Sequence, residues 1–140
     1  MYLRADPEHP NIIGFGNESE DWRYTFNMTG SIAASGNIQY LLTSDGNRND
    51  VPYSCYYGLF YDCTSLTQAP ELPATSLTDY CYASMFYGCT SLTQAPELLA
   101  TSLANGCYYY MFGGCSSLTN AYFPNLDSNT VINEIVEGDQ

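Results

Sequence analysis

Apolar side chains recur at every fourth position in three separate stretches of the chain. Because positions i, i+4 and i+8 lie on one face of a helix, each stretch is predicted to form a short helix with a buried stripe. Gly88 and Gly114 stand just before the last position of two stripes, where glycine can adopt the left-handed conformation that ends a helix. The stripes are Cys55, Leu59 and Cys63; Cys81, Met85 and Cys89; and Cys107, Met111 and Cys115.

A short extended segment is expected after each predicted helix. Leu66, Leu92 and Leu118 open these segments, and Pro70 and Pro96 end two of them. Because proline cannot donate a hydrogen bond to a neighbouring strand, each strand should be only about three or four residues long.

Both elements return with a fixed period. Residues 63–72 are identical to residues 89–98, and 19 of the 26 positions in 63–88 recur in 89–114. A unit of one strand and one short helix cannot bury its apolar face alone, whereas stacked copies form a continuous core and a parallel sheet. The predicted fold is therefore an α/β solenoid, a right-handed coil of short parallel strands and short helices with a 26-residue period.

The period also predicts how the chain is divided. One period before Cys63 lies Asn37, and Asn and Cys alternate at one position of leucine-rich repeats, so the first coil is expected to begin there. Terminal coils are expected to be atypical, because they face water on one side unless a cap covers them. The predicted parts are an N-terminal cap with one or more strands (1–36), repeat coils at 37–121 (37–62 degenerate, 63–88, 89–114, and 115–121 partial), and a C-terminal cap or tail (122–140).

The charge of the chain narrows its possible partners. It has 15 acidic residues, three arginines, no lysine and a formal net charge of −12. Phosphate backbones and anionic lipid surfaces would repel it, so binding to nucleic acid or to a membrane surface is not expected. No apolar run approaches the ~20 residues that a membrane span requires. The acidic residues could serve to keep a tyrosine-rich surface soluble. Alternatively, they could attract a cation or a basic partner.

The chain offers little for catalysis or for metal binding. Its one histidine, His9, lies in a turn-rich stretch far from the repeats, and no Cys-x-x-Cys pair is present. No glycine-rich phosphate loop follows a predicted strand. We therefore expect no enzyme activity, no catalytic residue, no metal site and no cofactor.

The six cysteines fall into two columns of the repeat. Within one helix the two cysteines would be ~12 Å apart, beyond the ~7 Å between Cα atoms that a disulfide allows. A pair in neighbouring coils could come close enough, but three per column leave one unpaired. We predict that they are buried thiols in a structural ladder made of Asn37, Cys63, Cys89 and Cys115 in one column and Cys55, Cys81 and Cys107 in the other.

Two groups of residues are candidates for ligand binding. Tyrosines follow the first cysteine of each repeat, and with the stripe buried several rings should lie at the surface, either stacking on a ligand or packing between helices. Glutamine and glutamate recur one period apart and should stack on one face, where they could bind a sugar or a cation. The candidates are Tyr56, Tyr57, Tyr82, Tyr108, Tyr109, Tyr110, Gln68, Glu71, Gln94 and Glu97.

The run Cys-Thr-Ser-Leu-Thr-x-Ala-Pro-Glu-Leu, followed by Cys-Tyr-x-x-Met-Phe-x-Gly-Cys, resembles the BspA-like (Treponema-type) leucine-rich-repeat surface proteins of bacteria. Residues 63–98 fit this pattern without gaps and 99–121 with substitutions, so that the resemblance covers about 24–121. One departure is Leu99, where the family usually has proline, as at Pro73.

The resemblance implies a leucine-rich-repeat fold, export, and adhesion or binding of host proteins and glycans, with no catalysis. The chain starts with no charged and apolar signal segment, so it would be one part of a longer exported polypeptide whose signal lies elsewhere. We therefore expect a non-enzymatic binding module of a secreted or cell-surface protein, with a host or bacterial protein or glycan as partner. The alternative is a structural spacer that displays a neighbouring domain.

Overall fold

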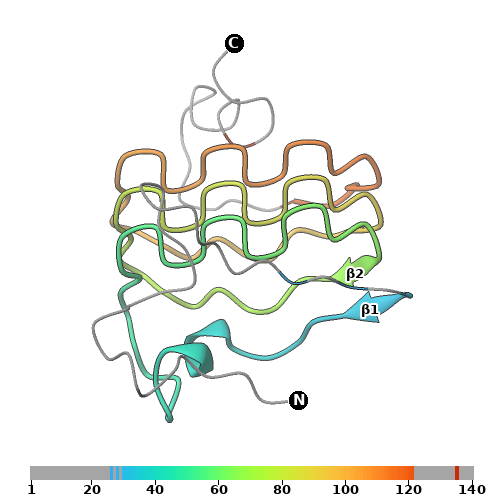
Figure 1. Ribbon diagram of the computed structural model, residues 1–140. Coiled ribbons are helices and arrows are strands. Elements are labelled where there is room, and N and C mark those ends of the chain that lie inside the picture. Colours follow the sequence, from blue (N-terminus) through green and yellow to red (C-terminus); the bar gives the residue numbers. More distant parts are fainter. Residues whose placement is uncertain (1–25, 27, 29, 122–134, 136–140) are drawn as a thin grey trace.

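The computed structural model describes residues 26, 28, 30–121 and 135. In this part the chain runs to and fro in layers that lie one above another, seen as the green, yellow and orange coils of Figure 1. One side of each layer is a regular wave of turns, and the other side is an extended segment. Strands β1 (Ile32–Ala33) and β2 (Leu66–Gln68) pair in parallel on the extended side. Single parallel bridges, such as that between Gln94 and Asn120, continue this pairing into the later layers.

The wave is built from consecutive β-turns, so the predicted short helices are wrong. Residues 53–62, 79–88 and 105–114 are all in turns. Peptide N–H groups alternate in direction along the wave: that of Tyr57 bonds within its coil to the Ser54 carbonyl at 3.2 Å, and that of Gly58 bonds to the Ala83 carbonyl of the next coil at 3.0 Å. Peptide N–H groups of the wave thus find partners, alternately within the coil and in the next coil, without a helix.

A positive φ at every fourth residue is what distinguishes these turns from a helix. Such a φ is required at the third residue of a type II turn and is foreign to an α-helix. A four-residue turn repeat also returns every fourth side chain to the same side, which is why the apolar stripes resemble a helical pattern. The positive-φ positions of the wave are Ser54, Gly58, Asp62, Tyr80, Ser84, Gly88, Gly106, Tyr110 and Gly114.

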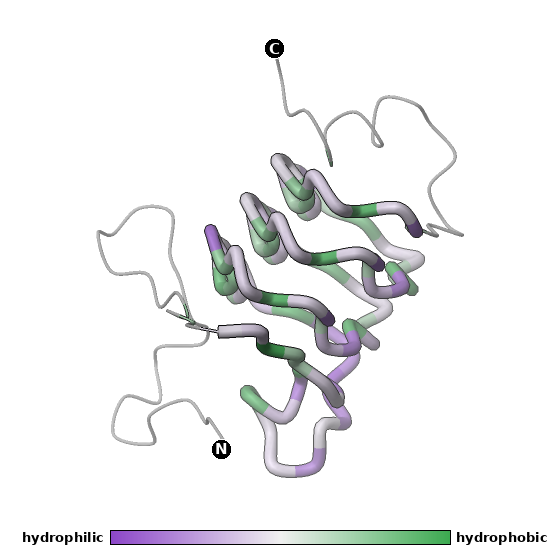
Figure 2. Tube along the Cα trace, turned by 90° about the vertical axis from the view of Figure 1, so that its right-hand side faces the viewer, coloured by the Kyte–Doolittle hydropathy of each residue, from purple (hydrophilic) through white to green (hydrophobic). Residues whose placement is uncertain are grey.

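Equivalent side chains of successive coils stack to form the core. Phe86 lies between Phe60 and Phe112, with ring centroids 5.4 and 5.6 Å apart and nearly parallel planes. Leu66 and Leu92 are fully buried on the extended side. Figure 2 shows the layers edge on, with hydrophobic segments recurring at the same places in each layer. Burial of these columns stabilises the stack by about 1.5–3 kcal/mol for each large apolar side chain.

The first coil is out of step with the sequence period. The Cys63 thiol donates to the Phe26 carbonyl at 3.1 Å, just as the Cys89 thiol donates to the Phe60 carbonyl at 3.1 Å. Phe26 therefore takes the place of Phe60 in the preceding coil, 34 residues earlier rather than 26. Asn37 bridges to Glu71 on the extended side and is not in the cysteine column, so its assignment to the ladder and to the start of a coil is wrong.

An insertion at one corner accounts for the difference. From Asn37 to Asp50 is a step of 13 residues, whereas the corresponding step from Glu71 to Ser76 is 5, so the first coil has eight additional residues. The insertion contains the 3₁₀ helix η1 (Ile38–Leu41). From Asp50 onward the 26-residue spacing holds, because Asp50, Ser76 and Ser102 bridge in turn.

The ends of the chain lie largely outside the described residues. This applies to most of the predicted N-terminal cap, to His9 and to nearly all of the predicted C-terminal cap. Ile135 is described: it is fully buried, and its carbonyl accepts a hydrogen bond from the Phe112 peptide at 3.0 Å. The assignment to the leucine-rich-repeat class stays a prediction.

Candidate functional site

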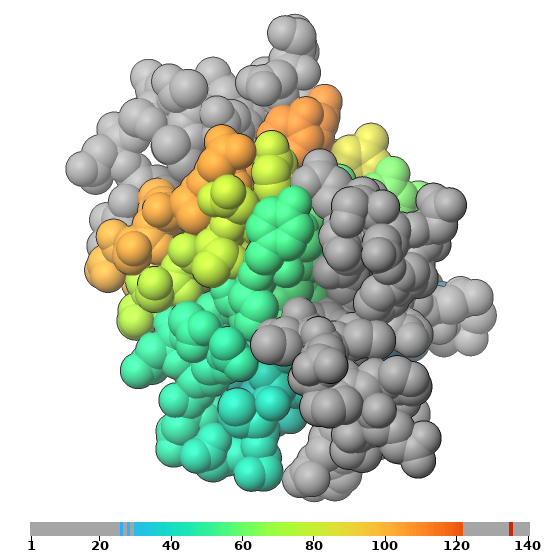
Figure 3. Space-filling view, turned by 60° about the vertical axis from the view of Figure 1, so that its left-hand side comes forward, coloured from blue at the N-terminus to red at the C-terminus, as the bar shows by residue number. Residues whose placement is uncertain are grey.

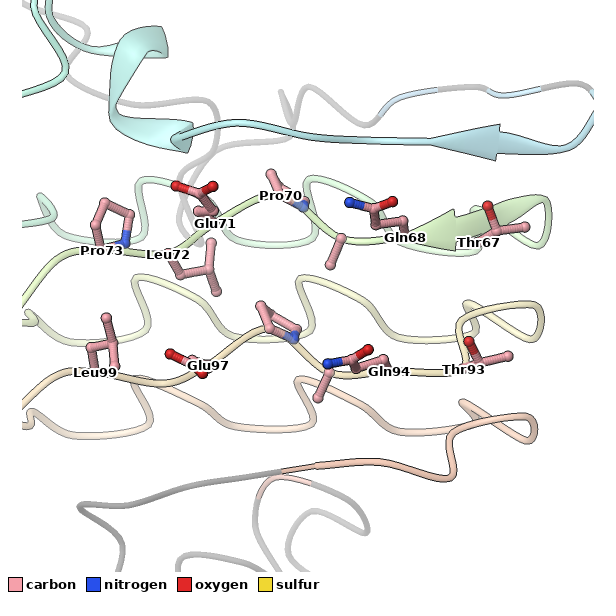
Figure 4. Close-up of a pocket in the computed structure, with 13 residues that line it drawn as sticks. Thr67, Gln68, Pro70, Glu71, Leu72, Pro73, Thr93, Gln94, Glu97 and Leu99 are labelled. Atoms are coloured by element: carbon pink, nitrogen blue, oxygen red, sulfur yellow. The ribbon is translucent and has the colours of Figure 1, made fainter.

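The extended side contains a groove between two successive coils. Its volume is about 710 Å³, and it runs along both copies of the repeated segment. Figure 4 shows Thr67, Gln68 and Glu71 of one coil above Thr93, Gln94 and Glu97 of the next. The lining residues are Thr67, Gln68, Ala69, Pro70, Glu71, Leu72, Pro73, Thr93, Gln94, Ala95, Pro96, Glu97 and Leu99.

Coil stacking puts like side chains in register along this groove. Gln68 and Gln94 are both exposed, and the bridge from Gln94 to Asn120 adds a third amide to the column. Glu71 and Glu97 form a second exposed column. Amides donate and accept hydrogen bonds, and carboxylates accept them, so the groove offers the same polar groups at each coil step. The structure thus brings together the four groove candidates of the sequence.

Hydrogen bonds join each of the two segments that line the groove to its outer neighbour. The Ala95 peptide donates to the Asn120 carbonyl at 2.9 Å, and the Ala34 peptide donates to the Gln68 carbonyl at 2.9 Å. The Thr67 hydroxyl donates to the Ile32 carbonyl at 3.0 Å. Pro70 and Pro96 further restrict the backbone between the amide and the carboxylate columns. The backbone that carries the polar side chains of the groove is therefore held on its outer sides.

Three of the tyrosine candidates are buried, so their assignment as ligand-binding residues is wrong. Tyr56, Tyr82 and Tyr108 are at most 3% exposed and stack on one another inside the molecule, with centroids 5.8 and 6.2 Å apart. Burial raises the pKa of all three hydroxyls well above the usual tyrosine value. The prediction failed because a chain of β-turns directs the residue after each first cysteine inward. Tyr57, Tyr109 and Tyr110 are half-buried on the turn side.

Other tyrosines of the turn side escaped the sequence analysis. Tyr61 and Tyr87 lie one period apart and stack with centroids 4.9 Å apart. Tyr53, at the other end of the wave, is 51% exposed. The signal that could have identified the first pair is the repeat itself, since the two tyrosines occupy the same repeat position.

None of the six cysteines forms a disulfide; five are buried and Cys115 is partly exposed. In the column that ends at Cys115, each thiol donates to the carbonyl of a phenylalanine in the preceding coil at 3.1 Å. Burial, reinforced by the nearby Asp62 carboxylate, raises the pKa of Cys63 to about 11, and burial raises that of Cys115 to about 11. Burial also raises the pKa of Cys81 and Cys89. These thiols are poor nucleophiles, because the thiolate is the reactive form.

Two further features bear on the candidate chemistry. Within the described residues, no three His, Cys, Asp or Glu side chains come together as metal ligands would. In the same part of the chain there is no helix of the length and apolar character that a membrane crossing requires.

Comparison of the chain with protein-family models, with curated proteins and with solved structures finds no match in any of the three.

Proposed function

We propose that the chain is a non-enzymatic binding module, of the leucine-rich-repeat class, from a secreted or cell-surface bacterial protein, and that its groove binds a glycan. The observation that carries the proposal is the register of the groove: Gln68 above Gln94 and Glu71 above Glu97. A ligand built from repeated units can present the same hydroxyl groups to each coil in turn. A host protein segment is the other ligand class that such a groove accommodates.

The chemistry of the groove favours a neutral glycan. Amide and carboxylate groups pair with neighbouring sugar hydroxyls, whereas an anionic glycan would be repelled by Glu71, Glu97 and the net charge of −12. No lining residue is Lys, Arg or His, so nothing in the groove compensates for a negative ligand.

The expected affinity follows from the hydrogen bonds available. One bond to a neutral group contributes about 0.5–1.5 kcal/mol net and one to a carboxylate about 1.5–3 kcal/mol. Two amides and two carboxylates together therefore support binding in the micromolar to millimolar range, once the entropy cost of association is subtracted.

A glycan array followed by titration calorimetry of the positive glycans tests the proposal. Glu71→Ala and Glu97→Ala should each weaken binding of a neutral glycan by about tenfold, because each removes a charged acceptor. Asp79→Ala is the matched control: it removes an exposed carboxylate from outside the groove and should leave the affinity unchanged. Absence of binding to every neutral glycan would refute the proposal and favour the spacer role.

A further inference from the structure

At one end of the groove the two coils differ. Successive coils lie side by side at the surface, seen as diagonal bands in Figure 3, so residues one period apart are neighbours. Along most of the groove these neighbours are identical, because the lining segment is repeated. At the left-hand end of Figure 4, however, Pro73 of one coil lies above Leu99 of the next. This end is therefore where the groove can distinguish one ligand from another.

Leu99 gives this end of the groove an apolar surface beside a carboxylate. Its side chain is 41% exposed, whereas that of Leu98 is 1% exposed, and Glu97 is exposed as well. This alternation places the Glu97 and Leu99 side chains on the same side of the extended segment, where outward residues are about 6.5 Å apart. Within the described residues the Glu97 carboxylate makes no hydrogen bond and no ion pair. The groove thus combines an available acceptor with an apolar contact.

An acetamido group matches both of these side chains. A sugar hydroxyl suits the carboxylate, but a hydroxyl placed against Leu99 would lose water without gaining a hydrogen bond. The N–H of an acetamido group donates to a carboxylate, and its methyl group packs on a leucine. The nitrogen and the methyl carbon are about 2.4 Å apart. A hydrogen bond of about 2.9 Å at one end and a contact of about 4 Å at the other therefore let one such group reach both side chains.

We propose that the groove selects a neutral glycan with an N-acetylated sugar bound at the coil of Leu99. The acetamido N–H donates to the Glu97 carboxylate, and the acetyl methyl group packs on Leu99. This inference rests on the proposed glycan binding and names the class of sugar. At the other coil Pro73 follows Glu71 at the same spacing, but it is partly buried and offers less apolar surface. The selection is therefore due to Leu99.

Titration calorimetry with two matched pairs of oligosaccharides tests the proposal. Oligomers of N-acetylglucosamine are compared with oligomers of glucose, and oligomers of N-acetylgalactosamine with oligomers of galactose, at equal length and linkage. In at least one pair the N-acetylated oligomer should bind about fourfold more tightly, which is the factor expected for burial of one methyl group. Its affinity should not depend on salt, because the ligand is neutral.

Variants of two leucines with similar exposure locate the contact. Leu99→Ser should weaken binding of the N-acetylated oligomer about fourfold and leave binding of the unacetylated oligomer unchanged. Leu99→Met keeps an apolar side chain and should retain the preference. Leu103→Ser is the matched control, because Leu103 is 40% exposed but does not line the groove. Urea unfolding of each variant shows whether its fold is intact.

Three results would overturn the selection by Leu99. One is that in neither pair does the N-acetylated oligomer bind more tightly than its counterpart, although some neutral glycan binds. Another is a Leu99→Ser variant that keeps the preference, or a Leu103→Ser variant that loses it to the same extent. Both of these results leave glycan binding by the groove intact. The third is absence of binding to every neutral glycan, in which case the proposed function fails as well.

Discussion

Two stacked tyrosines should respond in opposite directions to the same substitution. The Tyr56 hydroxyl is 2.9 Å from Gln39 Oε1 and 3.3 Å from the Ile38 carbonyl. The Tyr82 hydroxyl is buried and has no hydrogen-bond partner among the described residues. Both side chains are at most 1% exposed, and their rings are nearly parallel at 5.8 Å. Replacing either residue by phenylalanine therefore removes one hydroxyl from almost the same surroundings.

The magnitudes follow from what each hydroxyl contacts. Tyr56→Phe loses a hydrogen bond worth about 1 kcal/mol and leaves the fully buried Gln39 oxygen without this donor, so the free energy of unfolding should fall by about 1–3 kcal/mol. Tyr82→Phe removes a desolvated hydroxyl that has no compensating bond from the described residues, and should raise the free energy of unfolding by up to about 1–2 kcal/mol.

Urea unfolding followed by circular dichroism measures both changes. The two midpoints should move to opposite sides of the wild-type midpoint, with unchanged slopes. A Gln39→Met variant, alone and combined with Tyr56→Phe, closes a double-mutant cycle. The double variant should lose less stability than the sum of the losses of the two single variants, because either single change already breaks the bond between the two side chains. Equal effects of Tyr56→Phe and Tyr82→Phe, or loss of stability by about 1 kcal/mol or more in Tyr82→Phe, would refute this account of the tyrosine column.

Three further predictions concern backbone, thiol and charge. Gly106→Ala should lower the free energy of unfolding more than Gly36→Ala. Both glycines have a positive φ, which costs alanine about 1–2 kcal/mol, but only at Gly106 would the methyl carbon lie 2.5 Å from the Tyr80 ring of the preceding coil. Equal losses in denaturant unfolding would contradict this. Because the pKa of the Cys63 thiol is about 11, roughly one Cys63 thiol in a thousand is ionised at pH 8. Iodoacetamide should therefore modify Cys63 slowly in the native protein and quickly in urea, as measured by mass spectrometry. Rapid labelling of the native protein would be inconsistent with a buried thiol. Arg48 lowers the pKa of Asp50 by hydrogen bonding, so the ion pair stabilises the fold above the ordinary aspartate pKa, and this stabilisation is lost as pH falls through the lowered pKa. Arg48→Ala should lower the free energy of unfolding by less than about 1 kcal/mol at pH 7 and have no effect once Asp50 is protonated in acid. A loss of stability that persists in acid would point to packing instead.

The repeat predicts which residues stack, but not the conformation that stacks them. Gln68 and Gln94, or Phe86 and Phe112, could be paired from the sequence, because each pair is separated by one period. The helices could not be excluded in this way, since an apolar residue at every fourth position suits both a helix and a chain of four-residue turns. Glycine was the signal in the sequence that could have distinguished them. Gly58 lies in the middle of the first predicted helix, where glycine is disfavoured, and in the structure it has a positive φ.

The two other errors have the same origin. Tyr82 was named as a ligand-binding candidate because a helix has one buried stripe, whereas the turn wave also buries the residue that follows its first cysteine. Asn37 was placed by counting back one period, which fails where a coil is longer than its neighbours. Periodicity carries no information about an insertion until a contact between coils, such as that of Cys63 with Phe26, fixes the register.

The corner between Asn37 and Asp50 shows where this architecture tolerates changes in length. In the turn wave each coil is bonded to the next at every second peptide, so a single added residue would shift all later bonds. At the corner, eight residues are added and the spacing is regained by Asp50. Natural variants and engineered grafts that lengthen the protein should therefore fall at this corner, whereas elsewhere only whole 26-residue units can be gained or lost without breaking the ladder.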